Sequence, residues 1–151
     1  QELPRKVQNV EVLDLDGKPA KLPYFGEKNL MIFYVDPDRH KQNEDFTIEL
    51  EQNHRAESDN IHGFGVMNLK DAPMVPNGMA RNMAKKRTAK NGATVLADQN
   101  RILSTAWALG DCNNQFVLMI VSKEGELVFL RKGELSDADK EAFYETIEKY
   151  K

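Results

Sequence analysis

The stretch that decides the fold is residues 29–50, which read NLMIFYVDPDRHKQNEDFTIEL. Its apolar run, residues 30–35, predicts a buried strand. The polar segment after Pro37 has helical spacing, with Phe46 and Leu50 four residues apart on one face. Folds often place chemistry where a strand leads into a helix, because backbone N–H groups point outward there. The residues at this junction are Asp36, Pro37, Asp38, Arg39, His40 and Lys41, and none of them is a cysteine.

Length and composition indicate a single soluble domain. The chain has 151 residues, 40% of them hydrophobic and 30% charged, which is typical of a globular protein. Its longest apolar runs, residues 30–35 and 116–121, are far shorter than the ~20 residues of a membrane-spanning helix. The formal net charge of -3 predicts no general attraction to nucleic acid. We therefore expect one domain over residues 1–151, with residues 1–6 as a flexible arm, no transmembrane segment and no nucleic-acid partner.

The cysteine count and the first residues bear on the cellular compartment. Cys112 is the single cysteine, which excludes an internal disulfide and an intramolecular dithiol. The chain opens with Gln1 and a polar arm, so either it was trimmed or a signal peptide was cleaved. The polar arm suits signal cleavage, and we expect a periplasmic or secreted protein. The oligomeric state and the identity of any partner stay open.

Alternation and turn residues predict the remaining elements. Residues 7–15 predict a strand that turns at Asp16-Gly17 into a short partner at 19–22. Residues 61–69 predict a second main strand, and Asn77 is expected to cap a helix that runs to about Asn91 and stops at Gly92. The apolar face of that helix is expected to be Met79, Ala80, Met83 and Ala84.

The C-terminal half is predicted in the same way. Residues 94–97 predict a strand, residues 98–100 a turn, and residues 102–109 a short helix with Trp107 and Leu109 inward. The expected hairpin has strands at 115–122 and 126–131 around the loop Lys123-Glu124-Gly125. Ser136 is expected to cap the last helix. Two histidines, His54 and His62, are interpreted as surface loop residues.

This order of elements predicts an α/β protein with a mixed central sheet and helices on both faces. The chain resembles the thioredoxin fold in its TlpA/peroxiredoxin-like elaboration, a three-layer α/β/α arrangement with a C-terminal β-hairpin plus helix. The residues that carry the resemblance are the turn Asp16-Gly17-Lys18, the lead Gly26-Glu27-Lys28-Asn29 into a strand ending Phe33-Tyr34-Val35, Asp98 after a later strand, and the hairpin VLMIVSKEGELVFLRKGELSDAD. Within that superfamily, TVLADQNRILSTAWAL and GELSDAD are similar to the YtfJ-like bacterial periplasmic proteins, a group without the dithiol and without a settled biochemical role.

The departures from the superfamily pattern concern redox chemistry. The resemblance places the dithiol near Asp38 and Lys41, the cis-proline at Gln115 or Phe116, and a peroxidatic cysteine within residues 36–44. None of these positions holds the required residue. Thiol–disulfide exchange needs an attacking thiolate and a resolving thiol. We therefore do not expect dithiol oxidoreductase or peroxidase activity, and we expect no cofactor.

Three groups of residues are candidates for a site, and each has an ordinary structural interpretation. Asp36, Asp38 and His40 could hold a divalent ion, but aspartates at a helix start more often cap backbone N–H groups, so we expect no metal site. Cys112 lies in the polar loop before the hairpin. Near His40 and the helix start its thiol would be activated, whereas its ordinary role is to fill a loop.

The third group is the basic helix of residues 81–90. Its cations are Arg81, Lys85, Lys86, Arg87 and Lys90. They could bind an anionic partner, although a solvated helix face explains them equally well.

The leading hypothesis is a binding or interaction module that lost redox chemistry and kept the cleft between the helix start and the pre-hairpin loop. The cleft residues are expected to be Asp36, Asp38, Arg39, His40, Lys41, Asn114 and Gln115. Two alternatives from other classes remain. One is a single-cysteine enzyme or thiol sensor that uses Cys112 and His40. The other is an anion-binding regulator that uses the helix of residues 81–90.

Overall fold

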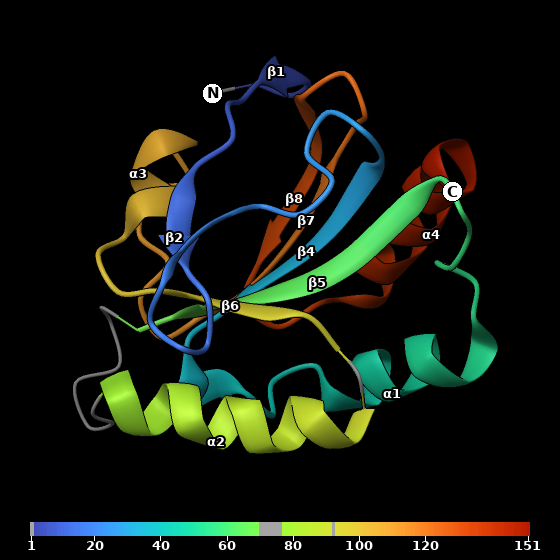
Figure 1. Cartoon of the computed structure of the whole chain (residues 1–151). Helices are drawn as coiled ribbons and strands as arrows, with labels where there is room; N and C mark the ends of the chain where they lie inside the picture. Colours follow the sequence, from blue (N-terminus) through green and yellow to red (C-terminus); the bar gives the residue numbers. More distant parts are fainter. Residues whose placement is uncertain (1, 70–76, 92) are drawn as a thin grey trace.

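One mixed sheet organises the chain. In the computed structural model, residues 2–69, 77–91 and 93–151 are described, and within them the strand order is β1-β8-β7-β4-β5-β6-β2-β3. The strands are β1 (Arg5–Lys6), β2 (Glu11–Leu13), β3 (Pro19–Lys21), β4 (Asn29–Val35), β5 (Ile61–Asn68), β6 (Val95–Asp98), β7 (Phe116–Val121) and β8 (Glu126–Lys132). The helices are the 3-10 turn η1 (Pro37–Arg39), α1 (Glu44–Asn53), α2 (Asn77–Asn91), α3 (Ile102–Ala106) and α4 (Asp137–Tyr150) (Figure 1).

The pairing of the main strands confirms the predicted topology. Strands β4 and β5 run parallel from Asn29 opposite Ile61 to Val35 opposite Met67. Strand β7 pairs antiparallel with both β4 and β8, so the C-terminal hairpin extends the sheet on the side away from β5. The sheet is therefore mixed, with its parallel part at β4, β5 and β6.

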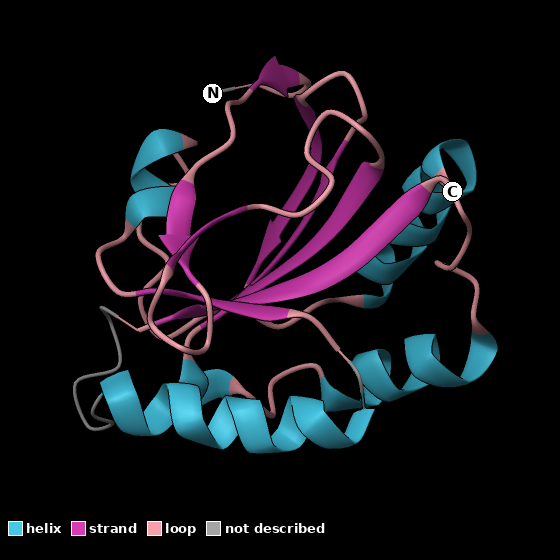
Figure 2. Cartoon of the chain, viewed as in Figure 1, coloured by secondary structure: helices cyan, strands magenta, loops and turns pink. Residues whose placement is uncertain are grey.

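Helices cover both faces of the sheet, in three layers (Figure 2). On one face, Leu30, Ile32 and Tyr34 of β4 are completely buried in a core that includes Trp107 after α3. The opposite face carries α1, α2 and α4, whose apolar residues pack against the alternate residues of the strands. Successive side chains of a strand point to opposite faces, which explains this division.

The predicted helix after Pro37 is interrupted. The 3-10 turn η1 ends at Arg39, and α1 begins at Glu44 after Asn43, which has a left-handed φ of 61°. The Asn43 side chain donates to the Gly133 carbonyl (3.0 Å) and accepts from the Leu135 N–H (2.9 Å). These bonds to the β8–α4 loop explain the interruption, because they hold Asn43 in a conformation that a helix does not contain.

The structure bears out the ends of the other long helices. Helix α2 covers Asn77–Asn91, so it ends where predicted, but Asn77 is its first helical residue and not the cap before it. The predicted stop at Gly92 lies outside the described residues. Ser136 caps α4 in a capping box with Asp139. Among the described residues, no helix is long and apolar enough to cross a membrane.

The apolar face of α2 is narrower than predicted. Ala80 and Ala84 are buried, but Met79 and Met83 are 56% and 55% exposed. The helix therefore meets the sheet through its two alanines, and the expectation of four inward residues is wrong for the methionines.

The N-terminal segment crosses the sheet from one edge toward the other. Arg5 and Lys6, predicted to lie in a flexible arm, form β1 and pair with Leu127 and Glu126 of β8. The chain then crosses over the α3 face, and β2 pairs with β6 on the other side of the sheet. The three valines of this crossing, Val7, Val10 and Val12, are buried in the core of that face.

Candidate functional site

The junction after β4 is tied to the pre-hairpin loop by Asp36. This side chain is completely buried; its Oδ1 accepts the Asp38 N–H and its Oδ2 accepts the Asn114 N–H, both at 2.9 Å. The Asp36 N–H also donates to the Gln115 carbonyl (3.1 Å). A carboxylate that accepts backbone N–H groups makes strong hydrogen bonds. The structure therefore confirms that these two segments adjoin, and it gives Asp36 a structural role at their contact.

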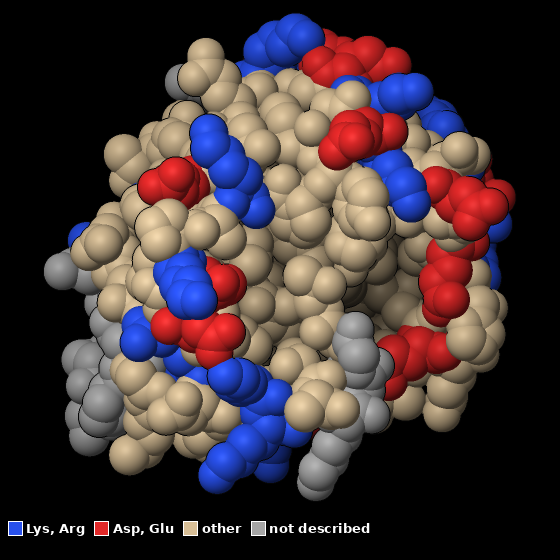
Figure 3. Space-filling view, viewed as in Figure 1, with Lys and Arg blue, Asp and Glu red and all other residues tan. Residues whose placement is uncertain are grey.

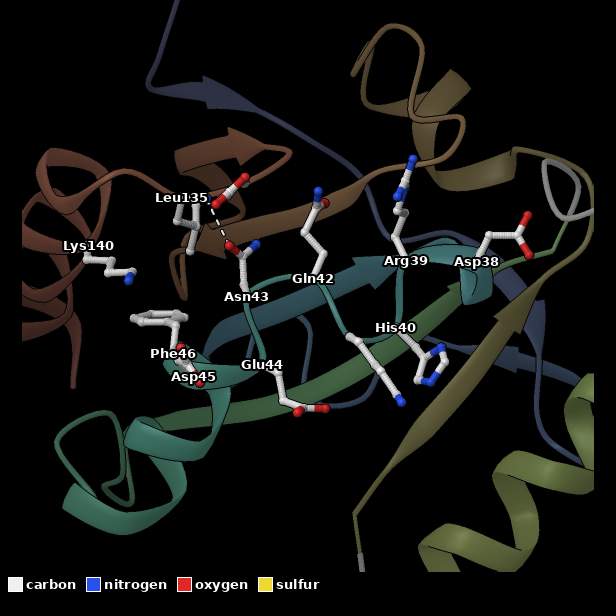
Figure 4. Close-up of a pocket in the computed structure, with 12 residues that line it drawn as sticks. Asp38, Arg39, His40, Gln42, Asn43, Glu44, Asp45, Phe46, Leu135 and Lys140 are labelled. Atoms are coloured by element: carbon white, nitrogen blue, oxygen red, sulfur yellow. Dashed lines mark hydrogen bonds between the residues drawn. The ribbon is translucent and has the colours of Figure 1, made fainter.

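The next residues form the exposed wall of a hollow. Asp38, Arg39, His40 and Lys41 are all exposed, and they line a space of about 610 Å³. Its other lining residues are Gln42, Asn43, Glu44, Asp45, Phe46, Glu134, Leu135 and Lys140 (Figure 4). We call this space the 38–46 hollow. In Figure 4, Arg39 and His40 point to opposite sides of the segment.

Three of the seven predicted cleft residues, Asp36, Asn114 and Gln115, do not line that hollow. Asn114 and Gln115 lie behind Asp36, and the loop that they form has no cis peptide; among the described residues the one cis bond precedes Pro4. Asn114 instead has a left-handed φ of 57°. The predicted cleft between helix start and loop is therefore closed by the Asp36 bonds, and the open space lies on the other side of the segment.

The structure does not bring Cys112 and His40 together. Cys112 is 3% exposed and belongs to the same core as Tyr34 and Trp107. His40 is exposed, its Nδ1 donates to the Pro37 carbonyl (2.9 Å), and it lines a hollow with Phe33 and Val35. Because Tyr34 points to the opposite face of β4 from Phe33 and Val35, the thiol and the imidazole lie on opposite sides of the sheet. The Cys–His contact that the single-cysteine alternative needs is therefore not formed, and the ordinary interpretation of Cys112 as a packing residue agrees with its burial.

The three candidate metal ligands do not converge either. Both oxygens of Asp36 accept backbone N–H groups, and the Nδ1 of His40 donates to a carbonyl. In the described part of the chain, no group of three His, Cys, Asp or Glu side chains could hold a metal ion. The arrangement at the junction is that of a capped turn.

A second buried carboxylate, which the sequence analysis interpreted as part of a turn, is Asp98. It is completely buried at the end of β6 and accepts the N–H groups of Asn100, Ile102 and Leu103 and the Tyr34 hydroxyl (2.9 Å). Burial, and then the Asp98 carboxylate, raise the pKa of Tyr34 far above its ordinary value. Asp98 lies three residues before the N-cap Arg101, so the usual N-cap pattern does not indicate it.

Two cations of the basic helix α2 are bound by side chains from other parts of the chain. Lys85 forms an ion pair with Asp16, and Arg81 donates to Gln99. Lys86 is exposed, and the side chains of Arg87 and Lys90 lie outside the described part. The hydrogen bond and charge of Asp16 raise the pKa of Lys85, and those of Lys85 lower the pKa of Asp16. Two of the five cations thus already have a partner within the chain.

Between α1 and α2 the sheet surface is open. Two hollows of about 590 and 810 Å³ adjoin there, and both are lined by Phe33, Gly65, Ala93 and Val95. We call the two together the apolar trough. Figure 3 shows the surface hollowed between β5 and α1, with acidic side chains along one side. The sequence signal for it was the pair Gly63 and Gly65 inside a central strand, which leaves room above the sheet.

Comparison with solved structures identifies the architecture. The exposed lipoprotein thioredoxin of Streptococcus pneumoniae superposes with a TM-score of 0.67 at 19% identity, covering 94% of this chain and 99% of that one. The fold is thioredoxin-like. The thioredoxin domain of a thiol-disulfide oxidoreductase from Bacteroides vulgatus gives 0.61 at 16% identity over 96% and 94% of the two chains. A peroxiredoxin-like protein from Aquifex aeolicus gives 0.65 at 11% identity over 97% and 88%.

These comparisons bear on the fold and not on the activity, because every identity is below 20%. No protein-family model and no curated protein sequence matches the chain. Function therefore has to be argued from the residues themselves.

Proposed function

We propose that this chain is a binding module that uses a thioredoxin-like frame without thiol–disulfide chemistry. The binding surface is the segment 38–41 and the 38–46 hollow that it borders. The observation that carries the proposal is the division between this surface and the single thiol: the exposed end of β4 holds Asp38 and Lys41, while Cys112 is 3% exposed on the other face of the sheet.

The chemistry of exchange explains why this division matters. An attacking thiol must be deprotonated and must reach the disulfide in line. Cys112 is packed among core side chains, and its Sγ contacts the Gly110 carbonyl at 3.7 Å. The segment 38–41 offers carboxylate, guanidinium, imidazole and ammonium groups to solvent instead. These groups suit recognition of a polar or charged ligand.

The surface is also held in place, as binding requires. Asp36 fixes one end of the segment through two backbone N–H groups, and Asn43 fixes the other end through the Gly133 carbonyl and the Leu135 N–H. A segment fixed at both ends loses little conformational entropy on binding. The exposed side chains between these two anchors are therefore presented on a rigid support.

The first test addresses the thiol. Alkylation of Cys112 is followed in the folded protein as a function of pH, with the urea-unfolded chain as the reference. We expect slow modification in the folded protein and fast modification after unfolding. A fast rate in the folded protein with a midpoint well below ~8.5, the free-cysteine value, would favour the single-cysteine enzyme or sensor and refute the module.

The second test addresses the surface. A fragment library is screened by amide NMR shifts, and hits are repeated on Lys41→Glu and, as a matched control on the basic helix, Lys86→Glu. We expect shifts concentrated on residues 38–46 that Lys41→Glu reduces and Lys86→Glu leaves unchanged. Hits that depend on Lys86 would favour the anion-binding regulator instead.

An exported location and membership of the YtfJ-like group are further parts of the proposal. They are supported by the resemblance of residues 94–109 and of the C-terminal hairpin to that periplasmic group. Antibody detection in the fraction released from source cells by osmotic shock tests the location. Retention of all the protein in the cytosolic fraction would overturn it.

A further inference from the structure

The central strand of the sheet is covered on one face and not on the other. Along β4 the side chains of Leu30, Ile32 and Tyr34 are completely buried, whereas the alternate residues Met31, Phe33 and Val35 are each only half-buried. A strand with neighbours on both sides and helices on both faces should be buried throughout. The exposed alternate residues mark the floor of the apolar trough, where α1 and α2 leave the sheet uncovered.

Glycines deepen this floor. Gly63 is exposed and Gly65 is half-buried, although Gly63 is paired with β4 and Gly65 is paired with both β4 and β6. A Cβ at Gly65 would meet the Phe33 carbonyl oxygen and a Val95 methyl at 3.7 Å, which is ordinary contact. Packing between the strands therefore does not require glycine at position 65. Its effect is to keep side-chain volume out of the trough.

Around Gly65 the floor offers no main-chain partner to a ligand. Strand β5 is hydrogen-bonded to β4 from Ile61 to Met67, and to β6 from Gly65 to Asn68, so its N–H and C=O groups from Gly65 to Met67 are engaged on both sides. An extended peptide over Gly65 would leave its own backbone groups without partners, which is costly away from water. An elongated ligand with a continuous hydrocarbon body has no such cost. The seven residues of β4 give the trough a length of about 20 Å at the usual rise per residue.

The ends of the trough differ in charge. Glu51 and Glu57 line the end near the start of β5, with Thr47 and Ser58 beside them. At the other end Asp38 and His40 line the trough, and Arg39 and Lys41 lie next to them in sequence. Among the described residues that line the trough, none is Lys or Arg. The Glu51–Glu57 end is therefore the negative one, and it suits a cation.

We propose that the apolar trough binds an elongated amphiphile whose hydrocarbon body lies over Gly65 and whose cationic head lies at Glu51 and Glu57. This inference rests on the proposed function in one respect, because it takes the chain to be a binding module. The volumes of the two hollows fall within the range of small-molecule sites, and apolar walls with a few polar groups at the ends are typical of them. The exposed Met83 on the rim adds an adaptable apolar wall.

The test uses dodecylamine and dodecanoate, each below its micelle concentration, in calorimetric titrations of the whole chain. We expect dodecylamine to bind at one site and at least ~10-fold more tightly than dodecanoate, a difference of about 1.4 kcal/mol. Amide NMR shifts should concentrate on Gly63, Gly65 and Val95. Shifts spread over the whole chain, or tighter binding of dodecanoate, would overturn the proposal.

Two variants locate the body and the head of the ligand. Gly65→Val fills the floor without a clash at its Cβ and should weaken dodecylamine binding at least ~10-fold, while the matched control Gly78→Val, at an exposed position with nothing near its Cβ, should leave it unchanged. Glu51→Gln should reduce the preference for the amine over the carboxylate. Unchanged binding in Gly65→Val would overturn the placement even if the protein binds the amine.

The amphiphile proposal and the proposed function can fail independently of each other. Fragment binding at the 38–46 hollow and slow alkylation of Cys112 are measured without the amphiphile, so either can fail alone. If both surfaces bind their probes, Gly65→Val should weaken amine binding at least ~10-fold and should leave unchanged the fragment-induced shifts at residues 38–46.

Discussion

Replacing Asp36 by alanine should be among the most destabilising substitutions in the chain. The side chain is completely buried and accepts the N–H groups of Asp38 and Asn114 at 2.9 Å each. A hydrogen bond to a charged group contributes roughly 1.5–3 kcal/mol, so loss of both predicts about 3–6 kcal/mol of destabilisation. Asp36→Asn keeps one acceptor oxygen and turns an NH2 group toward the other N–H, which predicts a loss of about 2 kcal/mol.

Urea unfolding followed by the fluorescence of the buried Trp107 measures these losses. The matched control is Asp38→Ala, two residues away and exposed, which should stay within ~0.5 kcal/mol of the parent. Hydrogen exchange of the Asn114 amide gives an independent readout, since it should accelerate in Asp36→Asn. If Asp36→Ala unfolds at the same urea concentration as Asp38→Ala, the reasoning about the buried carboxylate is refuted.

Three further predictions concern other tied groups. Asn43→Gly and Asn43→Ala both lose the two side-chain hydrogen bonds, but glycine adopts the left-handed φ of residue 43 without strain. Asn43→Gly should therefore lose roughly 1–2 kcal/mol less unfolding free energy than Asn43→Ala in urea. Equal losses in the two variants would contradict backbone strain at this position. Burial, and then the Lys28 ammonium, lower the pKa of His62 below 6.5. The contribution of neutral His62 to the stability of the fold is therefore complete above pH 6.5 and is lost as the pH falls through the folded pKa. His62→Asn should flatten this pH dependence of unfolding, and an NMR titration of His62 with an unshifted pKa would contradict the reasoning. Tyr34→Phe should cost about 1 kcal/mol of unfolding free energy, since Asp98 loses the hydroxyl but keeps its three backbone donors. Because the pKa of Tyr34 is raised, the stabilising effect of its neutral hydroxyl is complete below pH 10 and is lost as the pH rises through the folded pKa. An ultraviolet titration in which all tyrosines of the folded protein ionise near pH 10 would contradict this shift.

The sequence was sufficient where local signals and burial agree. The apolar run of β4 and the hairpin of β7 and β8 were predicted because both combine high hydrophobicity with clear turn residues. Ser136 was predicted as the cap of the last helix from the residues beside it, and the structure adds the reciprocal bond from Asp139. In each of these cases the stabilising contact lies within a few residues or along a whole strand.

The sequence was insufficient where a distant contact decides the conformation. Asn43 leaves the helical region because of Gly133 and Leu135, some ninety residues later, and no local pattern indicates that. Cys112 lies between polar neighbours, which suggests exposure, yet its own side chain enters the core beside Tyr34. His62 was interpreted as a surface residue but is half-buried against Tyr24 and Phe64.

The candidate residues 38–41 lie in the open beyond the end of β4, and the hollow that they line lies toward α4 and not toward the pre-hairpin loop. Their role in binding stays a prediction. The apolar trough could not be predicted, because it depends on the spacing between α1 and α2, which two glycines in β5 permit but do not determine.

The path of the N-terminal segment has a consequence for synthesis on the ribosome. Strand β1 is translated well before its partner β8, since Arg5 pairs with Leu127. Until β7 and β8 have emerged, Val7, Val10 and Val12 lack the core residues that the hairpin supplies, such as Met119 and Leu127. The nascent chain therefore keeps β1 unpaired until β8 has emerged, and a stall before β8 would yield a fragment with that strand open to proteases and chaperones.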